Sequence, residues 1–198
     1  MRSIRANRHL RSFGFVLGMG FLVSSRFACA QNASPTARAS APTSDARVAF
    51  DALKGLAGGW SGRVTTEPPS PEIEGPIHVT MRVGSRGNLL LHEMMSGGQP
   101  EPTLIFVDSD RLTLVHYCDA GNRPRLVARA SDGKTMAFDF VDISGSTAPT
   151  FVEHVEFTMT DANHHLEHWT FVLPGDQRLR AHFDLTRSQN SGPNPAGQ

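Results

Sequence analysis

The spacing of apolar residues changes once along this chain, near residue 58. Phe50, Leu53 and Leu56 recur every three residues, which places their side chains on one face of a helix, and two glycines at 58 and 59 predict its end. Beyond them the apolar residues recur at every second position, as in residues 77–83 (IHVTMRV), which is typical of a half-buried strand. The pattern therefore predicts a short helix, too short to be stable alone, that plugs or flanks a sheet.

Ten segments after the helix have the pattern of strands. They are residues 60–66, 77–83, 88–95, 103–107, 111–117, 124–130, 135–141, 151–160, 164–172 and 177–186. The segments between them are mostly short and rich in Gly, Asn, Asp and Pro, which suits hairpin turns. Parallel pairing would need crossovers of a dozen or more residues, and the sequence has none.

Sequential hairpins predict an antiparallel meander. An open sheet of ten strands would leave exposed edges, whereas closing the sheet removes them. We therefore predict an all-β fold, an antiparallel up-and-down β-barrel of about ten strands with a short N-terminal helix, over residues 46–187. A β-sandwich is the alternative.

The first thirty residues have the composition of a secretory signal peptide. Four arginines within the first eleven residues precede an apolar run, residues 13–23 (FGFVLGMGFLV), and small residues follow at Ala28 and Ala30. An apolar helix of that length spans only about 16 Å, roughly half of the hydrocarbon layer, so a permanent transmembrane anchor fits less well. We predict cleavage after Ala30. A lipidated Cys29 is the alternative, although Arg26 fits a lipoprotein motif poorly.

After the predicted cleavage, the remaining chain has a polar segment on each side of the barrel region and a different net charge. Residues 31–45 and 188–198 hold little that a core would bury, so we predict a disordered linker and tail. The chain has 19 basic and 19 acidic residues, and the first thirty residues contain five arginines and no acid, so 14 basic residues and a net charge of −5 remain. Cys118 is then the single cysteine. We expect a periplasmic or secreted monomer, with no nucleic-acid partner and no stable membrane insertion.

Residues 58–62 (GGWSG) stand after the helix, at the head of the first strand. This Gly58-x-Trp60 pattern resembles the lipocalin and calycin superfamily, in whose barrels the indole packs across the floor and an arginine ending the last strand covers it. Arg187 holds the matching place. The resemblance implies that Trp60 and Arg187 close the barrel, through a cation–π contact of about 0.5–2 kcal/mol. Otherwise Trp60 is one more core aromatic and Arg187 a surface charge.

A second resemblance is narrower. Residues 114–125 (LVHYCDAGNRPR) are similar to the DUF1579-like family of bacterial proteins, which has a lipocalin-like domain; the shared pattern is His116-Tyr117-Cys118, then Gly121-Asn122, then Pro124-Arg125. Arg123 departs from it, because a glutamine is usual there. Nitrobindin-type haem barrels also belong near this fold, but the C-terminal part lacks their haem-ligating pattern. No cofactor is therefore predicted, with haem as an alternative.

Strand alternation sorts the histidines. His78, His154 and His182 are predicted to face outward, whereas His92 and His116 share the parity of neighbouring leucines and can face the lumen. The face of the strand at 164–172 stays open. The candidate ligand-binding residues are His92, His116, Tyr117, Arg125 and His168.

These features predict a barrel that binds a small, largely apolar molecule in a lumen opposite Trp60. One alternative is an enzyme that uses His92, Glu93, His116 and Cys118, in which His116 would lower the pKa of the thiol. That chemistry needs an orienting group and an oxyanion site, and the sequence identifies neither, so no catalytic residue is assigned. The other alternative is a haem or metal carrier, although no short metal-ligand motif stands out beyond a loose histidine group at 164–168.

Overall fold

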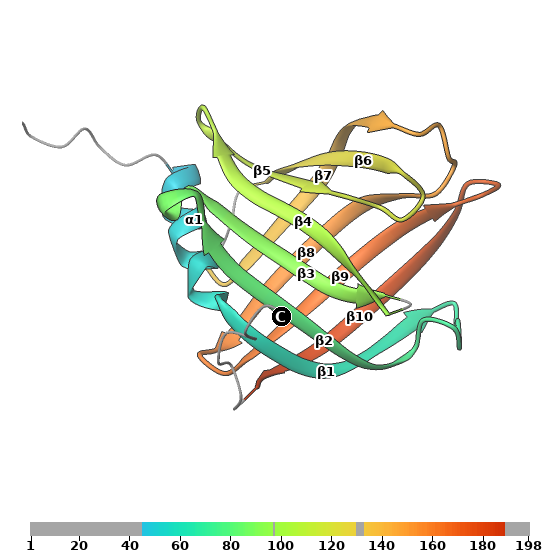
Figure 1. Cartoon of the computed structure of the whole chain (residues 1–198), viewed down its shortest axis with the longest axis horizontal. Coiled ribbons are helices and arrows are strands. Elements are labelled where there is room, and N and C mark those ends of the chain that lie inside the picture. The colour runs from blue at the N-terminus through green and yellow to red at the C-terminus, as the bar shows by residue number, and fades with distance from the viewer. Residues whose placement is uncertain (1–44, 97, 130–132, 189–198) are drawn as a thin grey trace, which may run out of the picture. The chain divides into compact units, whose positions relative to one another are not determined.

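A computed structural model describes residues 45–96, 98–129 and 133–188, which belong to one compact unit (Figure 1). The elements are α1 (Asp45–Leu53), a 3-10 turn (Lys54–Leu56), β1 (Gly58–Glu67), β2 (Gly75–Gly84), β3 (Leu89–Ser96), β4 (Gln99–Asp108), β5 (Arg111–His116), β6 (Asn122–Ala128), β7 (Thr135–Gly145), β8 (Phe151–Asp161), β9 (His164–Leu173) and β10 (Gln177–Arg187). The predicted signal peptide, nearly all of the predicted linker and residues 189–198 lie outside the described residues. Within the described part, no helix has the length and apolarity to span a bilayer.

The ten strands form one closed barrel in which every neighbouring pair is antiparallel. Each strand pairs with the next along the chain, and β1 also pairs with β10, which closes the barrel. The predicted meander of ten strands is confirmed, and the sandwich is excluded. β4 begins at Gln99, four residues before the predicted strand, and holds Pro100 and Pro102, which lack the N–H that a strand donates. Asp45, predicted as the last linker residue, is the first residue of α1.

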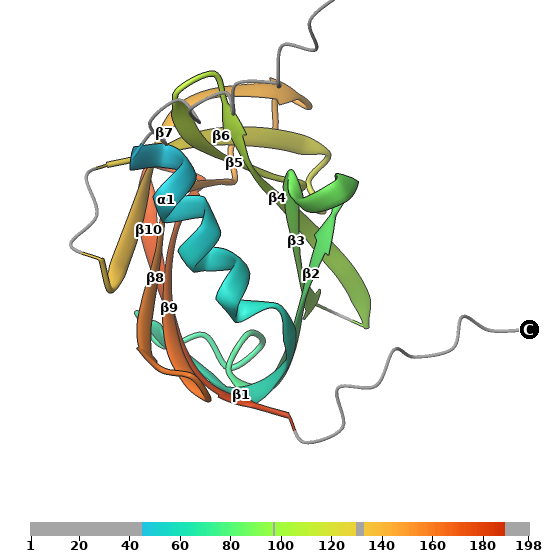
Figure 2. The same ribbon diagram turned by 90° about the vertical axis from the view of Figure 1, so that its left-hand side faces the viewer.

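Helix α1 lies across one end of the barrel, as Figure 2 shows. Its contacts are with β4 and β5. The three apolar residues with helical spacing, Phe50, Leu53 and Leu56, are all buried in the core, so the short helix is held by the barrel that it plugs. Along β10 the buried side chains alternate strictly, and Leu179, Ala181, Phe183 and Leu185 point inward.

The structure places Trp60 and Arg187 next to each other at this closed end, which we call the floor. The two residues are partners in the β1–β10 register, and the guanidinium carbon of Arg187 lies 4.2 Å from the centroid of the indole. The indole Nε1 donates to the carbonyl of Leu56 at 2.8 Å. Arg187 donates to three carbonyls, those of Ala57 (2.8 Å), Gly55 (3.1 Å) and Ala162 (3.0 Å). One side chain therefore ties the last strand to the turn before β1 and to the β8–β9 hairpin.

Two glycines of the GGWSG segment allow this close approach. Gly58 has φ of +138°, and a Cβ there would lie 2.5 Å from Nη1 of Arg187. A Cβ on Gly62 would lie 1.8 Å from the carbonyl oxygen of Asp184 on β10. A side chain at Gly62 would therefore push β1 and β10 apart where the barrel closes, whereas one at Gly58 would strain the backbone and displace the guanidinium of Arg187.

Candidate functional site

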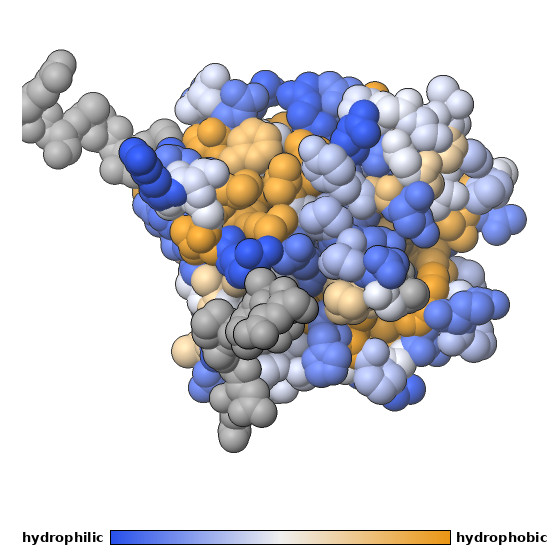
Figure 3. Space-filling model, viewed as in Figure 1, coloured by the Kyte–Doolittle hydropathy of each residue, from blue (hydrophilic) through white to orange (hydrophobic). Residues whose placement is uncertain are grey.

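A cavity of about 470 Å³ opens at the end opposite the floor, which we call the mouth. Its walls are mainly apolar, with side chains of β1, β2, β3, β9 and β10: Val64, Ile77, Met94, Phe171, Leu179 and Phe183. Polar groups join the lining at Glu101, His116 and Cys118. Figure 3 shows apolar side chains recessed at the right-hand end of the molecule, among hydrophilic ones. The volume and the composition are those of small-molecule sites.

His116 is the buried polar group of this cavity, with an exposed fraction of 1%. Its Nδ1 lies 2.8 Å from the hydroxyl of Thr103, and its Nε2 lies 3.6 Å from Oε2 of Glu101. Because Nε2 faces a carboxylate, we assign the ring proton to Nε2, and the Thr103 hydroxyl then donates to Nδ1. Burial, and then the charge of His92, lower the pKa of His116 to about 3. The imidazole is therefore neutral at physiological pH.

Deeper in the barrel, the carboxylate of Glu167 is fully buried and surrounded by nitrogen donors. His92 Nε2 lies 3.1 and 3.2 Å from its two oxygens, and His165 Nε2 lies 2.9 Å from Oε1. The indole Nε1 of Trp169 donates to Oε2 at 2.9 Å. A proton on Nε2 of each histidine therefore points at the carboxylate. Within the described residues, Nδ1 of both histidines has no hydrogen-bond partner.

These donors decide the ionisation of Glu167. Burial alone would raise its pKa, but the charge of His92 and the hydrogen bonds from His165 and His92 outweigh burial, so the pKa lies well below its ordinary value. Glu167 is thus a carboxylate in the middle of the barrel. A buried charge is tolerated only where such partners are present.

Aromatic rings connect this carboxylate to both ends of the barrel. Towards the floor, the ring of His165 lies edge-on to Trp60, with centroids 4.2 Å apart. Towards the mouth, the ring of Trp169 lies 5.5 Å from that of His92 and 5.4 Å from that of His116. A column of polar and aromatic side chains, which we call the central column, therefore runs from the floor to the base of the cavity.

Of the five residues predicted to bind ligand, His92 and His116 point into the barrel, but only His116 lines the cavity. Tyr117 does not, since its neighbour His116 takes the inward position; its side chain is 41% exposed, beneath the guanidinium of Arg123. Arg125 also points outward, because Pro124 and Leu126 on either side of it are buried, and it pairs with Asp142. Tyr117 and Arg125 therefore lie outside the cavity, away from His116.

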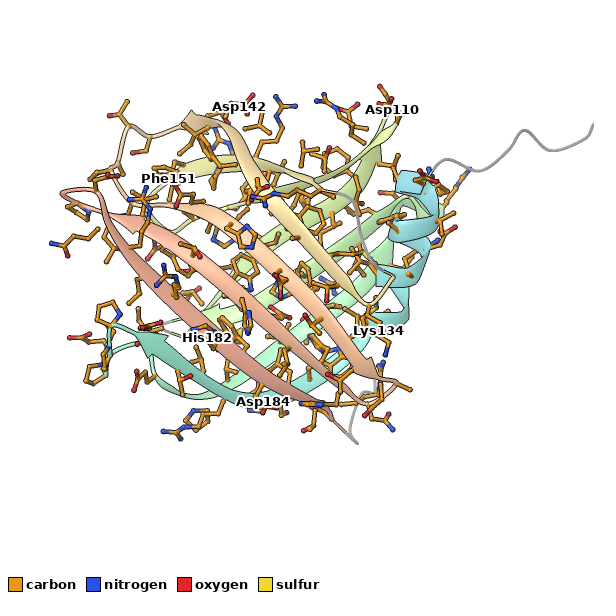
Figure 4. All side chains as sticks on the ribbon, turned by 180° about the vertical axis from the view of Figure 1, so that it is seen from behind. Asp110, Lys134, Asp142, Phe151, His182 and Asp184 are labelled. Atoms are coloured by element: carbon orange, nitrogen blue, oxygen red, sulfur yellow. The ribbon has the colours of Figure 1, made fainter. Side chains whose placement is uncertain are left out.

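His168 is likewise outside the barrel, with 44% of its side chain exposed. Its ring packs 4.7 Å from that of His182, on the outer face of β9 and β10. Figure 4 labels His182 on this side of the barrel. Trp169 occupies the inward position on this strand, which settles the face that the sequence left open. Glu93 also faces outward and pairs with Arg82 at 2.8 Å.

The acid in the middle of the barrel is Glu167. The sequence did not identify Glu167 as a site residue, nor His165 or Glu101. One feature would have found it. Glu167 has the same parity as His165, Trp169 and Phe171, and two large aromatic residues are a stronger marker of the inner face than Leu166 and Val172 on the other parity.

Cys118 does not have the activated thiol that an adjacent histidine suggested. Burial raises the pKa of this thiol to about 11; a hydrogen bond from the backbone of Val152 offsets only part of this rise, and the charges of Glu101 and Asp119 add to it. Cys118 is a free thiol at the edge of the cavity and is protonated at neutral pH. In the described part of the chain, no group of three or more His, Cys, Asp or Glu residues is arranged to hold a metal ion.

Comparisons with known proteins show a similarity in fold. No family model matches the chain, and no curated protein matches it. A solved structure of a protein with unknown function from the DUF3598 family of Nostoc punctiforme is similar, with a TM-score of 0.50 and 10% identity over 69% of this chain. The match covers 48% of that protein, so this chain spans about half of its length. A redesigned β-barrel aligns with a TM-score of 0.35 and 15% identity, over 70% of this chain and 96% of the design. The chain thus has the fold of an antiparallel β-barrel that it shares with a DUF3598 protein.

Proposed function

We propose that this protein binds a small, largely apolar molecule in the cavity at the mouth of its barrel. The observation that carries the proposal is a hollow of about 470 Å³ with mainly apolar walls and the neutral imidazole of His116 at its base. Sites of this kind use apolar walls for affinity and a few placed polar groups for orientation. A DUF1579-like membership and a periplasmic or secreted location belong to the same proposal, on the residues at 114–125 and 1–30.

The rest of the barrel supports a binding site with one entrance. Trp60 and α1 fill the floor, and the central column fills the middle, so the cavity is a dead end rather than a channel. A ligand would enter between the hairpins of the mouth. The N–H of His116 and the oxygens of Glu101 would meet its polar end, and the apolar side chains of β1, β9 and β10 would meet the remainder.

Native mass spectrometry of the protein purified from cells that make it would show a retained ligand directly. A titration with the neutral dye N-phenyl-1-naphthylamine tests the cavity itself, because the dye fluoresces in apolar surroundings. We expect saturable binding to the wild type and about 10-fold weaker binding to Ala181→Leu, whose longer side chain would project into the cavity.

Arg180→Ala is the matched control for this titration. Arg180 is the neighbour of Ala181 on β10, but its side chain is exposed and lies outside the cavity. It should leave dye binding unchanged. An absence of saturable binding, or equal binding by Ala181→Leu and the wild type, would overturn the proposal.

A further inference from the structure

The charge of the cavity deepens the proposed function, on which this inference rests. We infer that the cavity selects amphiphiles with a cationic polar end over amphiphiles with an anionic one. The inference depends on three features: the sign of the charges at the mouth, the state of the buried polar group, and the apolar walls.

Every charged side chain that lines the cavity is acidic. Glu72, Glu74, Glu101 and Asp119 all contribute to it, and no lysine or arginine does so among the described residues. Arg63, an exposed residue of β1, acts on Glu74, and its charge helps to lower the pKa of that carboxyl. An anionic group entering the mouth would therefore meet charges of its own sign.

The rim charge is also fixed in place. The hydroxyl and the backbone N–H of Thr66 donate to Oε1 of Glu74 at 2.8 and 3.0 Å. These bonds, from the hydroxyl first, hold the pKa of Glu74 below its ordinary value, so the group is ionised at neutral pH. Glu74 thus presents a constant negative charge at the entrance.

At the base of the cavity, Glu101 and His116 also favour a ligand with a positive charge. Glu101 is only 17% exposed and lies beside His116, so its charge is screened by water less than that of a surface carboxylate. His116 gives an anion no countercharge, because the buried imidazole does not hold a second proton at neutral pH. An ammonium group near Glu101 would gain a favourable Coulomb interaction, whereas a carboxylate there would have no cationic partner.

The walls exclude a simple inorganic ion as the preferred ligand. Leu179, Phe171 and Phe183 offer apolar contact and no further oxygen donors, which suits a hydrocarbon chain or ring attached to the charged end. The ligand class is therefore an apolar body with an ammonium-type head, such as a long-chain or aromatic amine.

Three ligands with the same ten-carbon chain test the inference at pH 7.5: decyltrimethylammonium and decanoate, each below its micellar concentration, and 1-decanol, below its solubility limit. Each would compete with N-phenyl-1-naphthylamine for the full chain. We expect the cation to bind about 10-fold or more tightly than decanoate, with decanol between them. Glu101→Gln should weaken the binding of the cation by about 10-fold and strengthen the binding of decanoate.

Glu93→Gln is the matched control, because it removes one negative charge from the partner strand of β4 but on the outside of the barrel. It should change the binding of each ligand by less than about 2-fold. If decanoate binds as tightly as the cation, or if both substitutions have the same effect, the inferred selectivity is wrong while the cavity stands. If none of the three ligands competes although the dye binds the cavity, the selectivity is also wrong; if the dye itself does not bind saturably, the proposed function fails instead.

Discussion

The same strands form a closed end and an open end of the barrel. At the floor, Trp60 is buried and covered by Arg187, and α1 lies across the barrel; the hollow at this end, of about 520 Å³, runs along α1 beside β5, β6 and β7. At the mouth, the inward-facing positions carry similar apolar residues, but no helix covers them and a cavity of about 470 Å³ remains. The alternation that builds the walls is thus the same at both ends. Whether an end is closed depends on one helix and one cation–π pair.

The largest expected effect lies between the two ends, at Glu167. Glu167→Leu would leave the N–H groups of His92, His165 and Trp169 buried without an acceptor, so we expect a loss of about 3–5 kcal/mol in the free energy of unfolding. Urea unfolding followed by tryptophan fluorescence measures it. Glu167→Gln keeps the shape of the side chain and part of its hydrogen bonding, so the free energy of unfolding should fall by less. Wild-type stability in Glu167→Leu would show that the central column does not support the fold.

Acid should lower the free energy of unfolding through His116, at the mouth end of the central column. His116 has a folded-state pKa of about 3 against 6.5 as the ordinary value, so the unfolded chain binds this proton first and stability falls as the pH drops through that interval. Between pH 6.5 and 4.5 the wild type should lose roughly 2–3 kcal/mol more than His116→Gln.

Urea unfolding at each pH provides the measurement for His116. Glu167 is present in both proteins and the range ends at the ordinary pKa of a glutamate, 4.5, so Glu167 contributes little to the difference between them. Above pH 7.5 the two stability curves should run parallel. Parallel curves over the whole range would mean that His116 is not held neutral in the folded protein.

The floor depends on Arg187. Arg187→Ala removes the contact with Trp60 and three bonds to carbonyls, and we expect a loss of about 2 kcal/mol by thermal or urea unfolding. Arg187→Lys keeps the charge but not the fork of donors and should recover only part of the loss. Arg180→Ala, on the exposed face of the same strand, should change little. Equal effects of the two alanine variants would contradict a closing role for Arg187.

The smallest difference compares one substitution at the two ends. Leu53→Ala removes a fully buried side chain beneath α1, whereas Leu179→Ala enlarges a cavity that is already open to solvent. Both should destabilise the fold, with Leu53→Ala costing about 1–2 kcal/mol more, since the floor site cannot be filled by water. Matched urea titrations provide the comparison. A larger loss at Leu179 would mean that the mouth is the better packed end.

The elements of this fold were accessible from the sequence because each has a local cause. All ten strands carry alternating or strongly apolar runs, and turn residues stand between most of them. Pro100 and Pro102 concealed the start of β4, since pairing with β3 is a tertiary effect that overrides their low strand propensity. The segment at 58–62 indicated where the chain closes, because its glycines serve a local need for space.

The site was harder to predict because it depends on which face of a strand points inward. Apolar residues on both faces of β5 and β9 made the parity ambiguous, so His116 was placed in a group with Tyr117 and Arg125, which point away from it. Glu167 was missed for a related reason. A glutamate between histidines in the sequence resembles a solvated face, and only the barrel brings His92, 75 residues away, to its carboxylate.

The seam between β1 and β10 also determines how the barrel would respond to mechanical load. Because the strands are antiparallel, the start of β1 is paired with the end of β10, and Trp60 faces Arg187 at that point. A force that pulls these two strand ends apart would act across the ladder rather than along it, and would break the hydrogen bonds one pair at a time from the floor. The end that most stabilises the barrel at rest is therefore the end at which it would begin to unzip under tension.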